Sequence, residues 1–449
     1  MDGEPGAGIG KPGEGGERFS GDNVFAMGDS AMKNTGSGAG NISGAAGAAL
    51  SPAPRSYGVF VAFIAIIGAF SSLVNDMYLP TIPAMMREFH TTPSMTQMGI
   101  SMAMAGMGVG SLLWGSASDR YGRKPVLIIS LIIFAVATGV SLLSRGITFF
   151  VVCRFFQGLG AGGAMVLSTS IPADVYMGRQ LAKLMAIVGA INGVAPALGP
   201  VVGGLMADSV GWRGIFVLLF AIGAGMIFWT TRYRETLPPQ RRIQTSGFRT
   251  YLKEYGSLFR NGRFMIYVTI KAVAIGLLYA YLSSAPFIMQ DHYGFSSLQF
   301  GLIFGGNALA IAVGSTLALR FRVMKQGMVV GCVGMFLFAC GEAVVMWHGA
   351  SFLFYELSAV PMLMFSGMIF SSSNTLSMDV ARQEAGTASA ILSVVKYAFA
   401  AVVTPLVGLG DIMRSSSVVF VAVTAVALVL AWLAYRLKPL PDMVRHVGK

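Results

Sequence analysis

Long apolar segments follow one another along most of the chain. They begin after Arg55, and each is about 20 residues long, which is enough to cross roughly 30 Å of hydrocarbon as an α-helix. Twelve segments can be placed, at 58–80, 96–117, 125–144, 148–172, 183–206, 212–231, 265–289, 299–319, 327–347, 351–377, 386–408 and 415–436. They are continuously apolar and do not alternate in polarity, which excludes barrel strands. The pattern therefore predicts an all-α membrane protein with twelve transmembrane helices.

The longest polar break divides the predicted spans into two groups of six. This linker, residues 232–263, separates a predicted six-helix bundle at 57–231 from a second one at 264–437. Residues 1–56 are rich in Gly, Ala, Ser and Pro and lack large apolar residues, so we expect a disordered tail. Residues 438–449 form a second short tail.

Composition agrees with a chain that lies mostly in lipid. Hydrophobic residues make up 54% and charged residues only 12%, where a soluble domain carries about 25% charge. The mean hydropathy is +0.67. The three cysteines lie in apolar runs without metal-like spacing, so we expect packing residues.

The placement of basic residues predicts the orientation. With the N-terminus in the cytoplasm, only four of the 32 Lys and Arg fall on the outer side, namely Arg87, Arg145, Arg213 and Arg414. Three more fall inside spans, namely Arg154, Lys271 and Lys396, which leaves 25 on the cytoplasmic side. This obeys the positive-inside rule. The net charge of +12 is therefore a topology signal, and nucleic-acid binding is not expected.

The loop between spans 2 and 3 carries a charged motif. Its residues are Gly115, Asp119, Arg120, Gly122, Arg123 and Lys124. Asp119 can lie at the positive N-terminal end of a neighbouring helix, and Arg123 can pair with Asp174 near the end of span 4. Topology alone would need neither Asp119 nor Gly122, so we expect more than a basic anchor. This loop motif resembles the signature G-x-x-x-D-R-x-G-R-K of the major facilitator superfamily, in which it latches the two halves together on the cytoplasmic side.

Span 5 contains a second pattern, made of small residues and prolines. The residues of this span 5 motif are Gly193, Pro196, Gly199, Pro200, Gly203 and Gly204. Small residues allow close helix packing, and the prolines bend the helix. The motif resembles the signature g-x-x-x-G-P-x-x-G-G that separates the drug:proton exporters of the family from importers. A plain small-residue interface is the alternative.

Two further motifs extend the resemblance. Arg154, Gln157 and Gly158 in span 4 resemble the exporters' R-x-x-Q-G motif. The stretch from Asp76 to Pro80 resembles the D-M-Y-L-P of the bicyclomycin and chloramphenicol resistance (Bcr/CflA) branch. A carboxyl in a membrane span can bind a proton from one side and release it to the other. Asp76 as an outer helix cap and Arg154 as a side chain snorkelling outward are the alternatives.

The resemblance implies a fold and a substrate cavity between the halves, near the midplane. It covers residues 57–440 and is weaker in the C-terminal half. It implies proton coupling by Asp76 and Arg154. The expected cavity residues are Asn75, Tyr78, Gln157, Tyr279, Phe287 and Lys396. Lys271, Glu342 and Glu356 are further polar outliers in the C-terminal spans, and the two glutamates can also be interfacial.

The function expected from these motifs is proton-coupled export of drug-like amphipathic small molecules, of the chloramphenicol and bicyclomycin type, across the bacterial inner membrane. The alternatives are export of one metabolite such as an amino acid or sugar, a transport-dead receptor, and an importer. There is no P-loop, no enzymatic motif, and no metal or cofactor site in the pattern. We expect a monomer whose partners are the substrate, protons and the bilayer.

Overall fold

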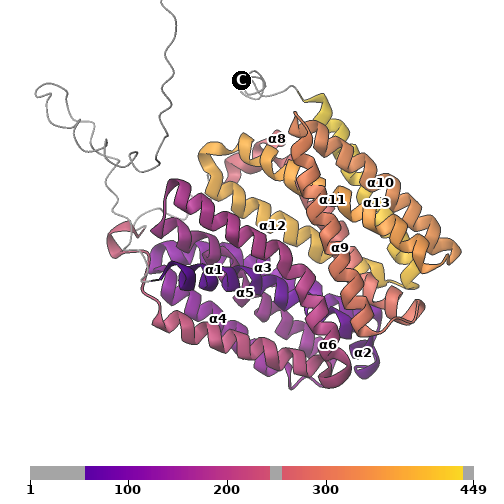
Figure 1. The fold of residues 1–449 in the computed structure, drawn as a ribbon, viewed down its shortest axis with the longest axis horizontal. Coiled ribbons are helices and arrows are strands. Elements are labelled where there is room, and N and C mark those ends of the chain that lie inside the picture. The colour runs from indigo at the N-terminus through magenta and orange to yellow at the C-terminus, as the bar shows by residue number, and fades with distance from the viewer. Residues whose placement is uncertain (1–55, 243–254, 438–449) are drawn as a thin grey trace, which may run out of the picture. The chain divides into compact units, whose positions relative to one another are not determined.

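The computed structural model describes residues 56–242 and 255–437, and within these ranges the regular structure is helical. The expected tails at 1–56 and 438–449 fall outside the described residues except for Ser56, as do residues 243–254 of the linker. Figure 1 shows the earlier helices grouped together and the later helices grouped beside them.

The N-terminal half, residues 57–232, is built from six long helical passes. Its elements are α1 (Tyr57–Asp76), the 3₁₀ turn Leu79–Thr81, α2 (Ile82–Glu88), α3 (Pro93–Tyr121), α4 (Arg123–Ser141), α5 (Ile147–Val175) and α6 (Gly178–Arg232). Several begin at residues suited to a helix start. For example, the Thr92 side chain accepts from Met95 N ahead of α3, and Pro93 occupies the first turn.

The longest helix, α6, contains two passes. It has 55 residues, about 80 Å at the α-helical rise of 1.5 Å per residue, which is far more than one membrane thickness. The break is Gly211, whose φ of +64° and ψ of −171° are non-helical and which glycine adopts at little cost. Length and composition give eleven membrane-spanning helices in the described residues, α6 among them. Division at Gly211 makes twelve, as the apolar pattern predicted.

The C-terminal half, residues 262–436, repeats this arrangement. Its elements are α8 (Gly262–Pro286), the π-helix Phe287–His292, α9 (Ser297–Leu317), the 3₁₀ turn Ala318–Arg320, α10 (Met324–His348), α11 (Phe352–Val380), the 3₁₀ turn Arg382–Glu384, α12 (Ala385–Val403), the 3₁₀ turn Thr404–Gly408 and α13 (Ile412–Arg436). Between the halves lie the 3₁₀ turn Pro239–Arg241 and a helical stretch at 255–260. Ser296 and Gln299 form a capping box at the start of α9.

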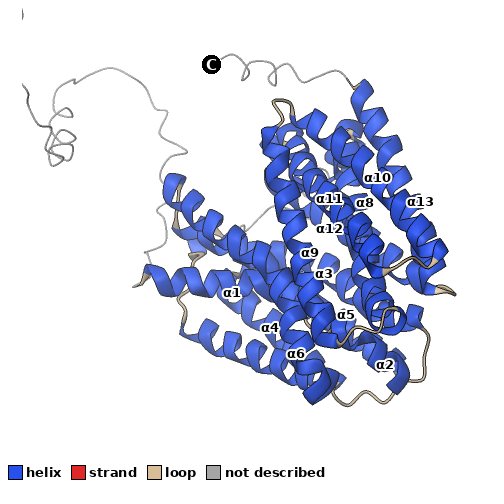
Figure 2. Cartoon of the chain, turned by 45° about the vertical axis from the view of Figure 1, so that its right-hand side comes forward, coloured by secondary structure: helices blue, strands red, loops and turns tan. Residues whose placement is uncertain are grey.

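The two ends of the spans differ in charge, and we name them accordingly. The basic end carries Arg120, Arg179 and Arg232, and the far end carries Arg87, Arg213 and Arg414. The two halves contact each other through two seams, α3 with α12 and α6 with α9, and the 3₁₀ turn Leu79–Thr81 contacts α8 and α9. Figure 2 shows the helical ribbons of both groups without strands in the described residues.

Side chains join the halves at the far end. Arg87 forms an ion pair with Asp291 at 2.9 Å. Gln290 Nε2 donates to the Pro80 carbonyl at 2.9 Å, and Ser297 Oγ donates to Asp208 at 2.9 Å. These three contacts bond the two halves together at the far end. At the basic end, the charged cluster around Arg123 is bonded to Asp119, to Asp174 and to Glu235, which follows α6.

Candidate functional site

Arg154 is held by the broken end of α1. The helix ends at Asp76, and the 3₁₀ turn that begins at Leu79 has Pro80 in its first turn, so the last carbonyls of α1 lack partners within the helix. Arg154 Nη1 donates to one of them, the Val74 carbonyl, at 3.1 Å. A guanidinium at a helix C-terminus also balances the negative end of the helix dipole.

The remaining hydrogen bonds of Arg154 go to α5, its own helix, to α1 and to α3. Nη1 donates to Gln157 Oε1 at 3.0 Å, Nη2 to Asn75 Oδ1 at 3.1 Å, and Nε to the Gly99 carbonyl at 3.3 Å. The guanidinium lies over the Tyr78 ring at 4.5 Å. Its exposed fraction is 0%, so the interpretation that Arg154 snorkels to the surface is wrong.

Gln157 carries this network further into the half. Its Nε2 donates to Thr138 Oγ1 at 3.1 Å and to Ser141 Oγ at 3.4 Å, both on α4. Gln157, Tyr78 and Asn75 are each at most 2% exposed. The structure thus places three of the expected cavity residues inside the N-terminal half, around Arg154.

Asp76 lies beside this network with a free carboxylate oxygen. The residue is 4% exposed, and Oδ1 is buried without a hydrogen-bond partner. The Asp76 carboxylate acts electrostatically on Arg154 and on Tyr279 of α8, but no ion pair within 4.0 Å joins it to Arg154. Asn75 accepts the guanidinium bond instead. Asp76 lies just ahead of the 3₁₀ turn Leu79–Thr81, which contacts α8 and α9 of the other half.

The span 5 motif packs against the same turn. A Cβ added to Gly199 would lie 3.1 Å from Asp76 Cβ, and one added to Gly203 would overlap the Met77 carbonyl. A Cβ on Gly204 would overlap the Ser297 carbonyl of α9, whereas Gly193 has open space around it. Pro196 and Pro200 lie inside α6. The glycines near the far end thus allow α6 to contact both α1 and α9 closely.

The loop motif is centred on Arg123. Its Nε donates to Asp174 at 2.8 Å, and its Nη1 donates to Asp119 at 2.5 Å and to Ser118 Oγ at 2.7 Å. The expected partner Asp174 thus accepts from Arg123. Gly122 has a φ of +108° and precedes α4, a conformation that favours glycine. Lys124 Nζ donates to the Thr231 carbonyl at 2.8 Å, and Gly115 lies in α3 ahead of Asp119 and Arg120.

The carboxylate at a helix N-terminus here is Glu235, which sequence reasoning did not assign. Its two oxygens accept from Arg123 N at 2.9 Å and from Lys124 N at 3.2 Å, the first residues of α4. Asp119 was expected to fill such a position and pairs with Arg123 instead. Burial raises the pKa of the nearby Tyr233 phenol, and Tyr176, Asp174 and Glu235 raise it further, so the phenol stays neutral. The signal in the sequence is the position of Glu235, an acidic residue just after the end of span 6.

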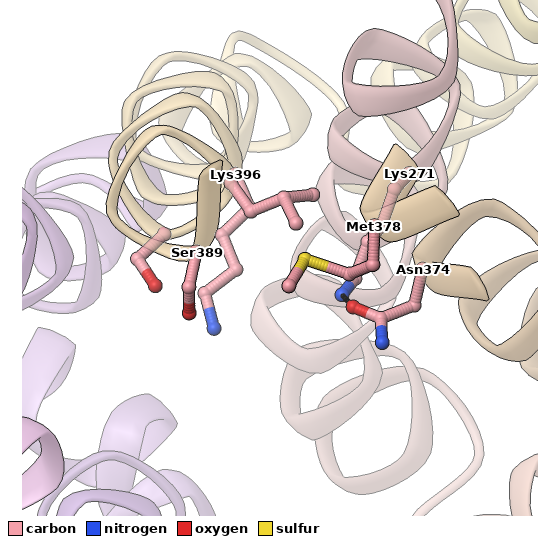
Figure 3. Close-up of a pocket in the computed structure, with 7 residues that line it drawn as sticks. Lys271, Asn374, Met378, Ser389 and Lys396 are labelled. Atoms are coloured by element: carbon pink, nitrogen blue, oxygen red, sulfur yellow. Dashed lines mark hydrogen bonds between the residues drawn. The ribbon is translucent and has the colours of Figure 1, made fainter. Parts of the chain in front are cut away.

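A pocket of about 230 Å³ opens between α8, α11 and α12 of the C-terminal half. Its lining residues are Lys271, Asn374, Met378, Ser389, Leu392, Ser393 and Lys396. Figure 3 shows Lys396 and Lys271 extending from different helices toward the space between them. Of the expected cavity residues only Lys396 lines this pocket. Tyr279 lies near Asp76, and Phe287 is buried in the π-helix that follows α8.

The two glutamates of the C-terminal half lie together. Glu342 is 0% exposed and accepts from the Ser358 hydroxyl. Glu356 is partly buried and accepts from Asn307 Nδ2 at 3.1 and 3.2 Å. Asn307 also contacts the Tyr281 hydroxyl at 2.7 Å. Glu342 is therefore not interfacial but buried inside this half.

The chain was compared with known families and proteins. The family model of the Major Facilitator Superfamily matches residues 64–405. An uncharacterized MFS-type transporter, YdgK of Bacillus subtilis, is 33% identical over 370 residues, covering 81% of this chain and 91% of that protein. A chloramphenicol resistance protein of Pseudomonas aeruginosa is 31% identical over 57% of this chain and 60% of its own length.

Other relatives are more distant. A bicyclomycin resistance protein homolog of Haemophilus influenzae is 24% identical, over 79% of this chain and 89% of its own. Among solved structures, a bacterial homolog of the human lysosomal transporter Spinster, inward-facing and occupied, has a TM-score of 0.69 at 16% identity. That match covers 86% of this chain and 98% of the solved one. This last likeness shows the fold.

Proposed function

Because the chain belongs to the Major Facilitator Superfamily, a family of transporters, we propose that it exports drug-like amphipathic small molecules in exchange for protons. We place it in the bacterial inner membrane with the basic end in the cytoplasm, since the positive-inside rule assigns that side. The relatives named for chloramphenicol and bicyclomycin resistance support the substrate type.

Asp76 carries the proposal. It is a buried carboxylate with one unpartnered oxygen, at the turn where α1 and α6 meet and near Tyr279 of the other half. An intramembrane carboxylate is costly and is kept for a task. A proton that binds there changes the local charge beside Arg154, whose four hydrogen bonds go to Val74, Asn75, Gly99 and Gln157.

The transport mechanism that we propose starts from the bonds that join the two halves at the far end. The far end is joined by Arg87 with Asp291 and by close glycine packing of α6 on α9. A substrate then reaches the protein from the basic end. Its binding competes with the proton on Asp76, and reprotonation from outside resets the carrier. Closing the basic end is the role that we propose for the loop motif around Arg123 and Asp174.

Export of one specific metabolite is the second candidate. The small pocket lined by Lys271, Lys396 and three polar side chains favours a narrow substrate range. A promiscuous site is usually larger and more apolar. The two candidates share the proton mechanism and differ in which compounds start the exchange.

Proteoliposomes with a pH-sensitive dye inside test both candidates. Under an imposed pH gradient, we expect chloramphenicol-type drugs to evoke proton flux in the wild type. Asp76→Asn should lose about 90% or more of that flux, because the amide cannot exchange a proton. Asp379→Asn removes the same charge from an exposed pair with Arg382 and should behave as wild type.

The other outcomes separate the alternatives. Flux evoked only by polar metabolites would favour the second candidate. Equal flux in the wild type and Asp76→Asn would show that Asp76 is structural and that another group carries the proton. A protein that moves neither drug nor metabolite would overturn the transport proposal.

A further inference from the structure

The pocket of the C-terminal half holds two cations inside the membrane spans. Lys271 lies on α8 and Lys396 on α12, and both line the same pocket with the polar residues Asn374, Ser389 and Ser393. Figure 3 shows both side chains extending into the region between α8 and α12. Lysines within membrane spans are rare and generally mark a pathway or a partner.

Within residues 56–242 and 255–437, neither lysine has a carboxylate partner within 4.0 Å. Lys271 Nζ donates to the neutral amide oxygen of Asn374 at 2.6 Å, and Lys396 Nζ lies 4.5 Å from the Tyr397 ring. The ion pairs within 4.0 Å among the described residues include neither. The two ammonium groups act on each other instead. The pocket therefore contains two lysine amines that have no carboxylate counter-ion among the described residues.

The acids of the spans are engaged elsewhere. Asp76 acts on Arg154 and Tyr279, Glu342 accepts from Ser358, and Glu356 accepts from Asn307. Two like charges in a partly dehydrated pocket repel each other, and an anion that enters between them reduces this repulsion. The serine hydroxyls and the Asn374 amide supply further donors for anionic oxygens.

From this geometry we infer that the pocket binds an acidic group of the transported molecule, such as a carboxylate, phenolate, sulfonate or phosphate. The inference rests on the proposed function in taking this pocket as part of the transport path. It adds to the proposed function a preference for amphipathic molecules with an anionic group over cationic ones of similar size. Cationic amphiphiles such as ethidium are poor ligands, because both lysines repel them.

A matched pair of dyes tests the inference by binding alone. Fluorescein is anionic and rhodamine 123 is cationic, and both have a xanthene ring. With the full-length protein in phosphatidylcholine nanodiscs and no pH gradient, fluorescence anisotropy gives both affinities. We expect fluorescein to bind at least about tenfold more tightly, as hydrogen bonds to charged groups allow.

Variants of the two lysines test whether the preference for the anionic dye arises in this pocket. Lys271→Gln and Lys396→Gln should each weaken fluorescein binding about tenfold, and the double variant should lose the preference for the anion. Lys271→Arg and Lys396→Arg should keep it. Lys183→Gln removes an exposed lysine of α6 and is the matched control. Thermal unfolding and a single elution peak exclude misfolded variants.

Two kinds of result would contradict the inference or identify the anion that binds. Equal affinity for both dyes, or unchanged fluorescein affinity in the double variant, would overturn the inference. An anionic lipid headgroup offers the same chemistry, so nanodiscs with phosphatidylglycerol form a second arm. If this lipid displaces fluorescein from the wild type, the anion site stands and its occupant comes from the membrane. If it does not, the occupant is a soluble anion. Because no translocation is measured, failure of export would leave this result intact.

Discussion

Two sets of cations lie within the membrane spans, and the protein surrounds them differently. Arg154 is fully buried and donates four hydrogen bonds to acceptors from three helices. Lys271 has one bond to a neutral amide, and Lys396 faces an aromatic ring at the edge of a pocket. A buried cation that donates to several acceptors stabilises the fold, whereas a cation with few partners at the edge of a pocket is available to a ligand.

The largest expected effect on stability comes from removing the hydrogen bonds of Arg154. Arg154→Met leaves the acceptors of Val74, Asn75 and Gln157 buried without their donor, at about 1–3 kcal/mol for each stranded group. We therefore expect a strongly lowered midpoint in thermal unfolding of the purified protein. Arg145→Met changes an exposed arginine at the far end and should leave the midpoint unchanged. A midpoint for Arg154→Met equal to that of the control would contradict the structural role of Arg154.

A change in packing near Asp76 should have an intermediate effect. The Cβ of Gly203→Ala overlaps the Met77 carbonyl, in the turn that presents Asn75 to Arg154. Overpacking of this kind costs about 1–3 kcal/mol. We expect lower stability and slower drug-evoked proton flux. Gly193→Ala in the same motif meets open space and should match the wild type in stability. Equal loss in both variants would mean that the motif acts through helix flexibility and not through contact.

The smallest expected effect is a gain in stability, from a variant of Lys396. Lys396→Met removes an unpaired cation, so the ligand-free protein should become slightly more stable. The gain should be a fraction of the about 2.5–3.5 kcal/mol that a lysine at a helix centre costs, because the pocket is open to water. Thermal unfolding without ligand measures it, with Lys183→Met as control. Clear destabilisation by Lys396→Met would show that Lys396 has a structural partner. Lys396 would then stabilise the fold, as Arg154 does.

Sequence periodicity and composition predicted most of the fold. Apolar length identified the spans, although α3 runs from Pro93 to Tyr121 where 96–117 was expected. Hydropathy identifies only the part of a helix that lies in hydrocarbon, so the polar ends of α3 were not included in the predicted span. The double pass of α6 was predicted as two spans because Ser209, Gly211 and Arg213 interrupt the apolar run.

The site residues could be predicted from the sequence only in part. Arg123 and Asp174 could be paired because a charged loop next to a span leaves few partners. The donation of Arg154 to Asn75, and the convergence of Lys271 and Lys396 on one pocket, depend on how helices rotate and pack. Those residues are 79 and 125 positions apart, respectively, and no local pattern links them. Glu235 at the start of α4 was missed for the same reason.

The central claim is that Asp76 holds the proton while the lysine pocket holds the substrate. Proton release on ligand binding tests it directly, in weakly buffered solution with a pH indicator and fluorescein as ligand. We predict that binding releases protons from the wild type, and that Asp76→Asn binds the dye but releases none. The Lys271→Gln, Lys396→Gln double variant should release protons only at much higher dye concentration. Proton release from Asp76→Asn equal to that of the wild type would contradict the account.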